Sequence, residues 1–280
     1  MSMSLCPPQL KAIYREGRLL PFVGAGVSRS VEWTDATGTV HGPSWEELVN
    51  QAASELGFAD PALARVRGTD LQILEYFKLK NSGQTAKLTN WLARLMYPPD
   101  DALRAAPILQ AIMKLESCRL IYTTNYDDFL ERTYSLTGKA ARTVVLETQM
   151  GWGGSAVEVV KFHGDLNHPD QIVLTESDYE RRLTLQSPLD ARLRADLLGR
   201  VVLFLGYSFR DPNVSYLFRR VTDEFGREPH HHGGPRAYIA LPDPSDFEYL
   251  LFRERQIGVI PLRGAFLTGD VAGLLADLCS

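Results

Sequence analysis

The sequence contains few cysteines and lacks a long hydrophobic run. Among its 280 residues the cysteines are Cys6, Cys118 and Cys279. They are far apart and odd in number, which matches neither a metal-binding pattern nor a disulfide framework. We therefore expect no metal and a reducing, cytoplasmic location. No run of about 18 apolar residues occurs, so no transmembrane helix is expected. The N-terminus also lacks the basic start and apolar stretch of a signal peptide.

An excess of positive charge is also missing. The chain has 30 Lys and Arg against 34 Asp and Glu, a formal net charge of −4. Proteins that bind nucleic acids usually carry a basic balance or a basic stripe, so no direct nucleic-acid binding is expected. The arginines between positions 181 and 200 are interrupted by acidic residues and predict a solvated helix face. The run His230–His232 precedes Gly233-Gly234-Pro235, which favours a solvated loop over a metal site.

Apolar runs of strand length alternate with helix-like segments along most of the chain. Such alternation predicts an α/β fold, with a Rossmann-like parallel sheet covered by helices on both faces. Ser44 and Glu47 form a capping box that starts a helix. From there to about residue 116 we expect a helical insertion after the first strand, within a single domain of residues 1–280. The predicted strands are 19–23, 119–124, 157–162, 172–174, 201–206, 236–241 and 257–262. The predicted helices after the insertion are 127–136, one near 178, 188–198, 212–225, 247–255 and 271–278.

Ligands of open parallel sheets bind beyond the carboxyl ends of the strands. Unusual polar or glycine-rich segments follow the predicted strands at that edge. They are Gly24–Ser28, Thr124–Asp127, His163–Asp165 and Gly206–Asn213.

Two of these segments contain glycines that allow a close backbone approach. Gly24-Ala25-Gly26 follows the first strand, where backbone amides favour a phosphate. A plain chain reversal explains the same turn equally well. Gly206 and Ser208 are placed to approach a ribose or phosphate, whereas Asp211 before Pro212 also fits the start of a helix.

The other two segments carry polar side chains. Asn125 and Asp127 follow a strand and fit either a catalytic role or the capping of the next helix. His163 stands at a strand end beside Gly164. Imidazole changes protonation near neutral pH, which suits a general base, although a lone histidine is often structural.

The joint order of these segments resembles the signature of the sirtuin superfamily. The matching residues are Gly24-Ala25-Gly26-x-Ser28, Thr123-x-Asn125-x-Asp127, His163-Gly164 and Gly206-x-Ser208. The fuller forms Thr-Thr-Asn-Tyr-Asp, Phe-His-Gly-Asp and Gly-Tyr-Ser-Phe-x-Asp-Pro-Asn are similar to the bacterial branch found in antiphage defence. Pro43-Ser44-Trp45 and Leu174-Thr175-Glu176-x-Asp178-Tyr179 fit the same branch.

Two departures from the protein-deacylating sirtuins are visible. Those enzymes carry a four-cysteine zinc module, which three scattered cysteines cannot build. They also carry Gly-Ile-Pro-Asp-Phe-Arg after the first glycine loop, where this chain has Arg29-Ser30-Val31-Glu32-Trp33. The resemblance therefore implies hydrolysis of NAD⁺ to nicotinamide and ADP-ribose. The alternatives are an NAD⁺-dependent deacylase and a non-catalytic sensor of NAD⁺ or ADP-ribose.

The resemblance also implies roles for residues. Asn125 would orient the ribose hydroxyls or water, Asp127 would lie near the nicotinamide amide, and His163 would accept a proton. The dinucleotide would contact Gly24, Ala25, Gly26, Ser28, Thr124, Gly206, Ser208 and Asp211. Because uncontrolled NAD⁺ loss would harm the cell, we expect a latent homo-oligomer. Its activating partner would be a protein such as a HerA-like ATPase or an Argonaute.

Overall fold

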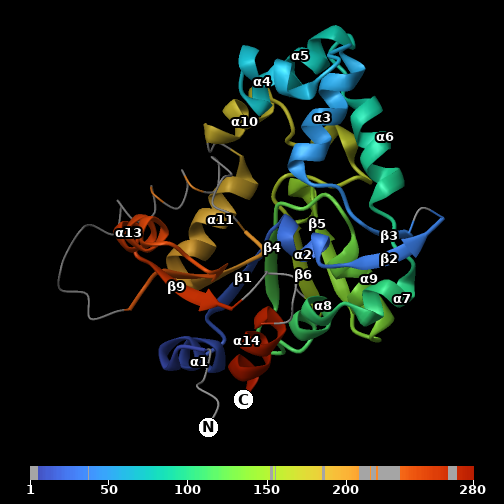
Figure 1. Cartoon of the computed structure of the whole chain (residues 1–280). Coiled ribbons are helices and arrows are strands. Elements are labelled where there is room, and N and C mark those ends of the chain that lie inside the picture. Colours follow the sequence, from blue (N-terminus) through green and yellow to red (C-terminus); the bar gives the residue numbers. More distant parts are fainter. Residues whose placement is uncertain are drawn as a thin grey trace.

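A parallel sheet forms the centre of the protein in the computed structural model (Figure 1). The structure describes residues 6–36, 38–151, 154, 156–184, 187–207, 215, 219, 234–263 and 270–280. Within these residues the sheet has seven strands in the order β5-β6-β4-β1-β7-β8-β9, and every pair of neighbours is parallel. The predicted α/β class and parallel sheet are confirmed. The strands are β1 (Leu19–Val23), β4 (Leu120–Thr123), β5 (Ala141–Val144), β6 (Val157–Lys161), β7 (Val201–Leu205), β8 (Ala237–Pro242) and β9 (Ile257–Leu262).

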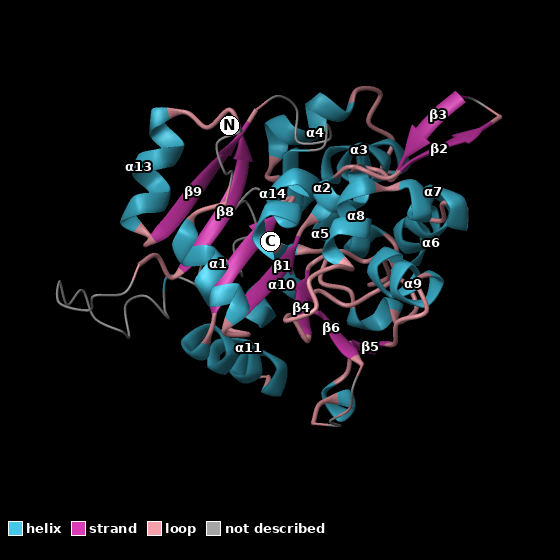
Figure 2. Ribbon diagram, turned by 90° about the horizontal axis from the view of Figure 1, so that it is seen from below, coloured by secondary structure: helices cyan, strands magenta, loops and turns pink. Residues whose placement is uncertain are grey.

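Strand β1 lies between β4 and β7, and its side chains alternate between two cores. Leu19 and Val23 belong to one core, whereas Leu20 and Phe22 belong to the other. All four are almost fully buried, as expected for a strand covered on both faces. The first core is completed by helices α1 (Pro8–Arg15), α8 (Pro107–Ile112), α9 (Phe129–Leu136) and α14 (Asp270–Cys279). The second is completed by α11 (Pro188–Gly199) and α13 (Asp246–Glu254). Figure 2 shows α9 and α11 on opposite sides of the sheet.

A helical group lies at the end of the molecule opposite the two termini (Figure 1). It consists of α3 (Trp45–Glu55), α4 (Pro61–Arg67), α5 (Asp70–Lys80) and α6 (Ala86–Leu95), which share a third core. The predicted capping box of Ser44 and Glu47 starts α3. The segment between β1 and β4 also holds α2 (Ala25–Arg29), the hairpin β2 (Glu32–Asp35) and β3 (Gly38–His41), and α7 (Asp100–Ala105). Helix α8 packs on the sheet instead of the helical group, so the insertion is not one separate body.

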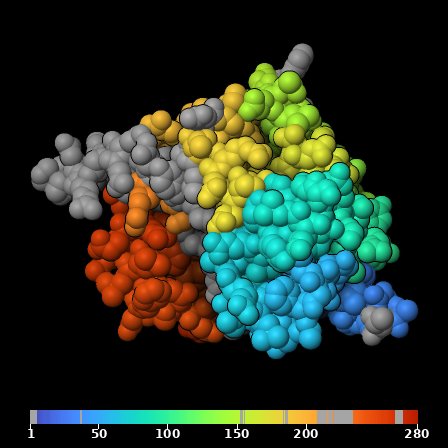
Figure 3. Space-filling view, turned by 90° about the horizontal axis from the view of Figure 1, so that it is seen from above, coloured from blue at the N-terminus to red at the C-terminus, as the bar shows by residue number. Residues whose placement is uncertain are grey.

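The strand predicted at residues 172–174 is wrong. These residues form a loop between a short 3-10 helix and α10 (Glu176–Leu183). Their apolar character has another cause, because Ile172 and Leu174 pack into the core of the helical group. Helix α10 continues this contact, since Lys78 of α5 forms an ion pair of 3.0 Å with Asp178. The cyan surface of α5 adjoins the yellow surface of α10 in Figure 3.

Several elements were not predicted from the sequence. Helix α1, the hairpin, α4, α7 and β5 have eight residues or fewer each, so few residues carry an apolar pattern that could predict them. The helix predicted at 212–225 and the run His230–His232 lie outside the described residues. No helix in the described part of the chain has the length and hydropathy to cross a membrane. The single-domain assignment stays a prediction.

Candidate functional site

The sheet register brings the predicted segments to one edge. Thr123 of β4 pairs with Val23 of β1 and with Lys161 of β6, and Val23 pairs with Leu205 of β7. The residues that follow these pairs therefore leave the sheet at the same level. Asn125 and His163 each stand two positions beyond the pair Thr123–Lys161. Since neighbouring strands are about 4.8 Å apart, their backbones lie close together.

Gly24, Gly26 and Gly206 pack against one another. The N–H of Gly24 donates to the Leu205 carbonyl at 2.9 Å, and the N–H of Gly26 donates to the Gly206 carbonyl at 2.9 Å. Gly206 has a φ of +62°, and a Cβ on it would lie 2.5 Å from the backbone nitrogen of Val27. The glycines thus join the end of β1 to the end of β7, and two of their amides are already used by protein carbonyls.

Replacing Gly206 by alanine should destabilise the fold. The new methyl group has no room beside Val27, and φ is positive, so we expect a loss of about 1–3 kcal/mol in the free energy of unfolding. Urea unfolding measures this loss. Gly199 is the matched control, because a Cβ there meets no atom within 4 Å. Equal stability of Gly206→Ala and Gly199→Ala would contradict the close packing.

Asn125 is held by hydrogen bonds to its backbone and to its side chain. Its N–H donates to the Thr123 hydroxyl at 3.0 Å. Its side-chain Nδ2 donates to the Gly24 carbonyl at 3.0 Å and to the Ser28 hydroxyl oxygen at 2.8 Å. The residue is 9% exposed, and its Oδ1 is buried with no hydrogen-bond partner in the described part of the chain. A buried amide oxygen without a donor is costly, so this atom is a ready acceptor for a ligand.

Ser28 and Asp127 continue this network. The Ser28 hydroxyl donates to Oδ2 of Asp127 at 2.6 Å, and Oδ1 of Asp127 accepts the N–H of Phe129 at 3.1 Å. Both residues are buried. The capping interpretation of Asp127 is thus confirmed, since its carboxylate binds an amide in the first turn of α9. The same carboxylate also fixes Ser28.

His163 lies among aromatic rings. It is 2% exposed, stacks on Phe162 with ring centroids 5.7 Å apart, and meets the edge of Tyr179 at 5.3 Å. Tyr179 belongs to α10, so this helix forms part of the surroundings of the imidazole. The backbone carbonyl of His163 accepts the N–H of Val173 at 3.0 Å. These contacts fix the ring at the end of β6, next to the segment that carries Asn125.

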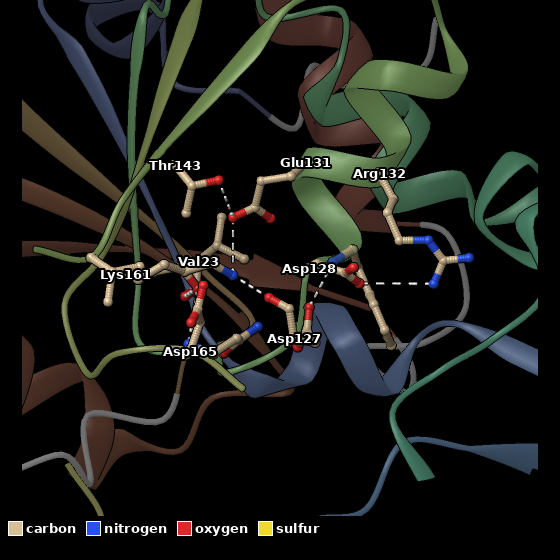
Figure 4. A network of polar contacts seen from close by, with 12 residues as sticks. Val23, Asp127, Asp128, Glu131, Arg132, Thr143, Lys161 and Asp165 are labelled. Carbon is tan, nitrogen blue, oxygen red and sulfur yellow. Dashed lines mark hydrogen bonds and ion pairs between the residues drawn. The ribbon is translucent and has the colours of Figure 1, made fainter. Parts of the chain in front are cut away.

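Lys161 is buried beneath the proposed site, and no role for it was predicted from the sequence. Lys161 is 2% exposed, forms an ion pair of 3.2 Å with Glu131 and donates to the carbonyl of Asp127. Figure 4 shows its ammonium group between Glu131, Asp127 and Asp165. Burial alone would lower the pKa of Lys161, but the Glu131 and Asp127 carboxylates outweigh burial and raise that pKa. Lysine 161 is therefore charged at neutral pH. The sequence signal that could have identified it is a lysine within the mostly apolar stretch Val157–Phe162, which indicates a buried charge with a partner.

The other predicted ligand-binding residues have different standing. Thr124 is half-buried, and its N–H donates to the Val23 carbonyl at 3.4 Å. Ser208 and Asp211 lie outside the described residues. Among the residues that are described, no group of three or more His, Cys, Asp or Glu side chains is arranged to hold a metal ion. A cavity of about 440 Å³ lies elsewhere, between the hairpin, α3 and α6, and contains none of the predicted site residues.

The sequence matches the model of the SIR2-like domain over residues 119–260, half of the chain. The chain belongs to the SIR2-like domain family. It is 30% identical over 247 residues to the NAD(+) hydrolase ThsA of Acinetobacter baumannii (strain 532279), covering 86% of this chain and 47% of that protein. It is 28% identical over 214 residues to the NAD(+) hydrolase ThsA of Bacillus cereus (strain MSX-D12), covering 75% and 41%. Defense-associated sirtuin 2 of Bacillus subtilis is 24% identical over 247 residues, covering 87% and 22%.

The predicted sirtuin resemblance is thus confirmed at the level of the family. The chain spans less than half the length of these relatives. The matched family region begins at Arg119 and contains β4, β6 and β7, and therefore Asn125, Asp127, His163 and Gly206.

Proposed function

We propose that this chain hydrolyses NAD⁺ to nicotinamide and ADP-ribose at the carboxyl edge of its sheet, as an NAD⁺-depleting effector of antiphage defence. The names of several relatives support the activity and the defence role. The single observation in the site that carries the proposal is the buried Oδ1 of Asn125, an acceptor without a donor in the described residues. A ribose hydroxyl supplies the donor that this atom lacks.

The reaction breaks the bond between the ribose carbon C1′ and the nicotinamide nitrogen. Nicotinamide leaves with the bonding electrons and becomes neutral, so positive charge develops on the ribose ring. The Asn125 carbonyl dipole favours this state over bound NAD⁺ because its negative end faces the ribose. Water then adds to C1′ and releases a proton, which His163 accepts. The products are nicotinamide, ADP-ribose and one proton.

The rest of the dinucleotide extends along the end of β1 and β7. Ala25 is the first residue of α2, where a backbone N–H has no acceptor within the helix. We assign it to the pyrophosphate, with Gly24 and Gly26 allowing a close approach to the start of α2. Thr124, Gly206, Ser208 and Asp211 complete the proposed contacts, with Gly206 and Ser208 on the adenosine side.

The direct test is to incubate the purified protein with NAD⁺ and separate the products by chromatography. Nicotinamide and ADP-ribose should form in equal amounts, without an acetylated peptide. Release of O-acetyl-ADP-ribose only when such a peptide is present would point to a deacylase instead. Tight NAD⁺ binding without nicotinamide release would point to a sensor. We further propose a latent, cytoplasmic homo-oligomer, so the assay is repeated with candidate activators such as a HerA-like ATPase or an Argonaute.

Replacing Asn125 by alanine should lower turnover about 10²–10³-fold, because a preorganised dipole facing the developing charge is removed. Steady-state rates measure this effect under conditions in which the unaltered protein is active. The folded fraction is checked by circular dichroism, since Ser28 and Gly24 lose a donor. Asn81→Ala is the control, because Asn81 caps the end of α5, where its Nδ2 donates to the Phe77 carbonyl. Full activity of folded Asn125→Ala would remove its proposed role.

A further inference from the structure

We propose that Ser28 and Asp127 are positioning residues that set the direction of the Asn125 amide. This inference rests on the proposed function. The resemblance to sirtuins leads one to expect both side chains to touch the nucleotide directly. Their hydrogen bonds instead run through each other to Asn125.

The direction follows from counting protons. A carboxylate only accepts hydrogen bonds, and a serine hydroxyl has a single proton to give. Because Ser28 donates that proton to Asp127, its oxygen must accept from Asn125. The second acceptor beside Asn125 is the Gly24 carbonyl, which also cannot donate. Both protons of Nδ2 are thus used, and Oδ1 is turned away from these partners.

A reversed amide would be penalised at both contacts. If Asn125 turned over, its Oδ1 would face the Gly24 carbonyl and a Ser28 oxygen whose proton already belongs to Asp127. Two buried acceptors that face each other are both left without a donor, which destabilises the reversed amide by roughly 1–3 kcal/mol. The backbone restricts the choice further, since the Asn125 N–H is held by Thr123 and the Thr123 hydroxyl donates to Val23.

The consequence concerns the kind of ligand that the site accepts. With Oδ1 fixed as an acceptor, the group opposite it must be a donor, and a ribose hydroxyl is one. The arrangement therefore selects a nucleotide with a hydroxyl-bearing ribose beyond its pyrophosphate. ADP-ribose has that ribose, whereas ADP does not. The dyad of Ser28 and Asp127 should therefore raise the affinity for ADP-ribose and leave the affinity for ADP unchanged.

The test uses two variants of the dyad and two matched controls in the full chain. Ser28→Ala removes the hydroxyl that links Asn125 to Asp127. Asp127→Asn places an amide nitrogen where Oδ2 accepted from Ser28, because the remaining oxygen accepts the N–H of Phe129, and this reverses the hydrogen bond to Ser28. Ser30→Ala is the control for serine, because Ser30 caps the end of α2 and donates to the Val27 carbonyl. Asp128→Asn is the control for aspartate, because Asp128 lies beside Asp127 and pairs with Arg132 at 3.8 Å.

Calorimetry should show that both dyad variants bind ADP-ribose about three- to tenfold more weakly than the unaltered protein, the effect of one hydrogen bond. Their affinity for ADP should not change, and neither control should affect either ligand. An equal loss for ADP and ADP-ribose would mean a general structural role and would overturn the proposal. Unchanged ADP-ribose affinity in both dyad variants would overturn it as well.

A second measurement is independent of any ligand. Nuclear magnetic resonance of the free protein should show slow solvent exchange for both side-chain amide protons of Asn125, since both are hydrogen-bonded and buried. Ser28→Ala and Asp127→Asn should speed the exchange, and the controls should not. If the protein bound neither nucleotide, the proposed function would fail while this exchange would still decide the orientation. Unchanged exchange in both dyad variants would refute it.

Discussion

Replacing His163 by alanine is expected to lower the rate of NAD⁺ hydrolysis about 10²–10⁴-fold, the usual effect of losing a positioned proton acceptor. No other imidazole belongs to the proposed site among the described residues, and His163 is fixed between Phe162 and Tyr179. His163→Gln keeps a polar side chain but cannot accept the proton, so it should be equally slow. Steady-state product formation measures both.

His168→Ala provides the matched control. His168 follows in the same loop, is more exposed and pairs with Asp165 at 2.8 Å. Its loss should leave turnover unchanged within about twofold, since its backbone N–H and its ring both bond to Asp165. Thermal unfolding shows whether each variant is folded. If folded His163→Gln were as active as the unaltered protein, proton transfer would have to be assigned to another group.

Replacing Lys161 by methionine is expected to destabilise the protein by about 3–5 kcal/mol, because the buried Glu131 would lose its counter-charge. The Asp127 carbonyl would lose a donor as well. Urea unfolding measures the free energy of unfolding. The double variant Lys161→Met with Glu131→Leu should recover part of the loss, since no unpaired charge is then buried.

Lys87→Met is the control for this prediction. Lys87 and Glu55 form a surface pair at 4.0 Å, and such pairs contribute about 0–1 kcal/mol. The dependence on pH has a definite sign. Because the pKa of Lys161 is raised above that of an unfolded lysine, its stabilisation is complete at neutral pH and is lost only as the pH rises through the folded value. A loss in Lys161→Met no larger than in Lys87→Met would show that the ion pair is not stabilising.

Apolar runs and turn residues predicted most of the sheet, because its central strands are covered on both faces. Strand β1 has the predicted bounds, and β7 ends one residue before its prediction. Short apolar segments do not distinguish a strand from a buried loop. Residues 172–174 have the composition of a strand, yet they fill a gap in the core of the helical group. Periodicity reports that a segment is buried, and the partner that buries it is fixed only by tertiary packing.

The position of the predicted segments at one sheet edge could be read from the sequence, and the contacts between their side chains could not. Gly24, Asn125 and His163 each follow a predicted strand, and the carboxyl ends of parallel strands meet at one edge of the sheet. Ser28 bonds to Asp127, and Lys161 contacts both the Asp127 carbonyl and Glu131. These contacts depend on the side-chain directions of residues that are remote in the sequence. A charged residue inside an apolar strand indicates only that a counter-charge exists. It does not say which residue supplies it.

The pairing of β1 has a consequence for biosynthesis. Leu19 to Val23 form five ladder pairs with β7 and only two with β4, and the Gly24 and Gly26 amides bond to Leu205 and Gly206. During translation the first strand therefore emerges long before its main neighbour. A nascent chain that has not yet reached residue 206 lacks the partners of Gly24 and Gly26, so the sheet edge that carries the proposed site stays unassembled until β7 has left the ribosome.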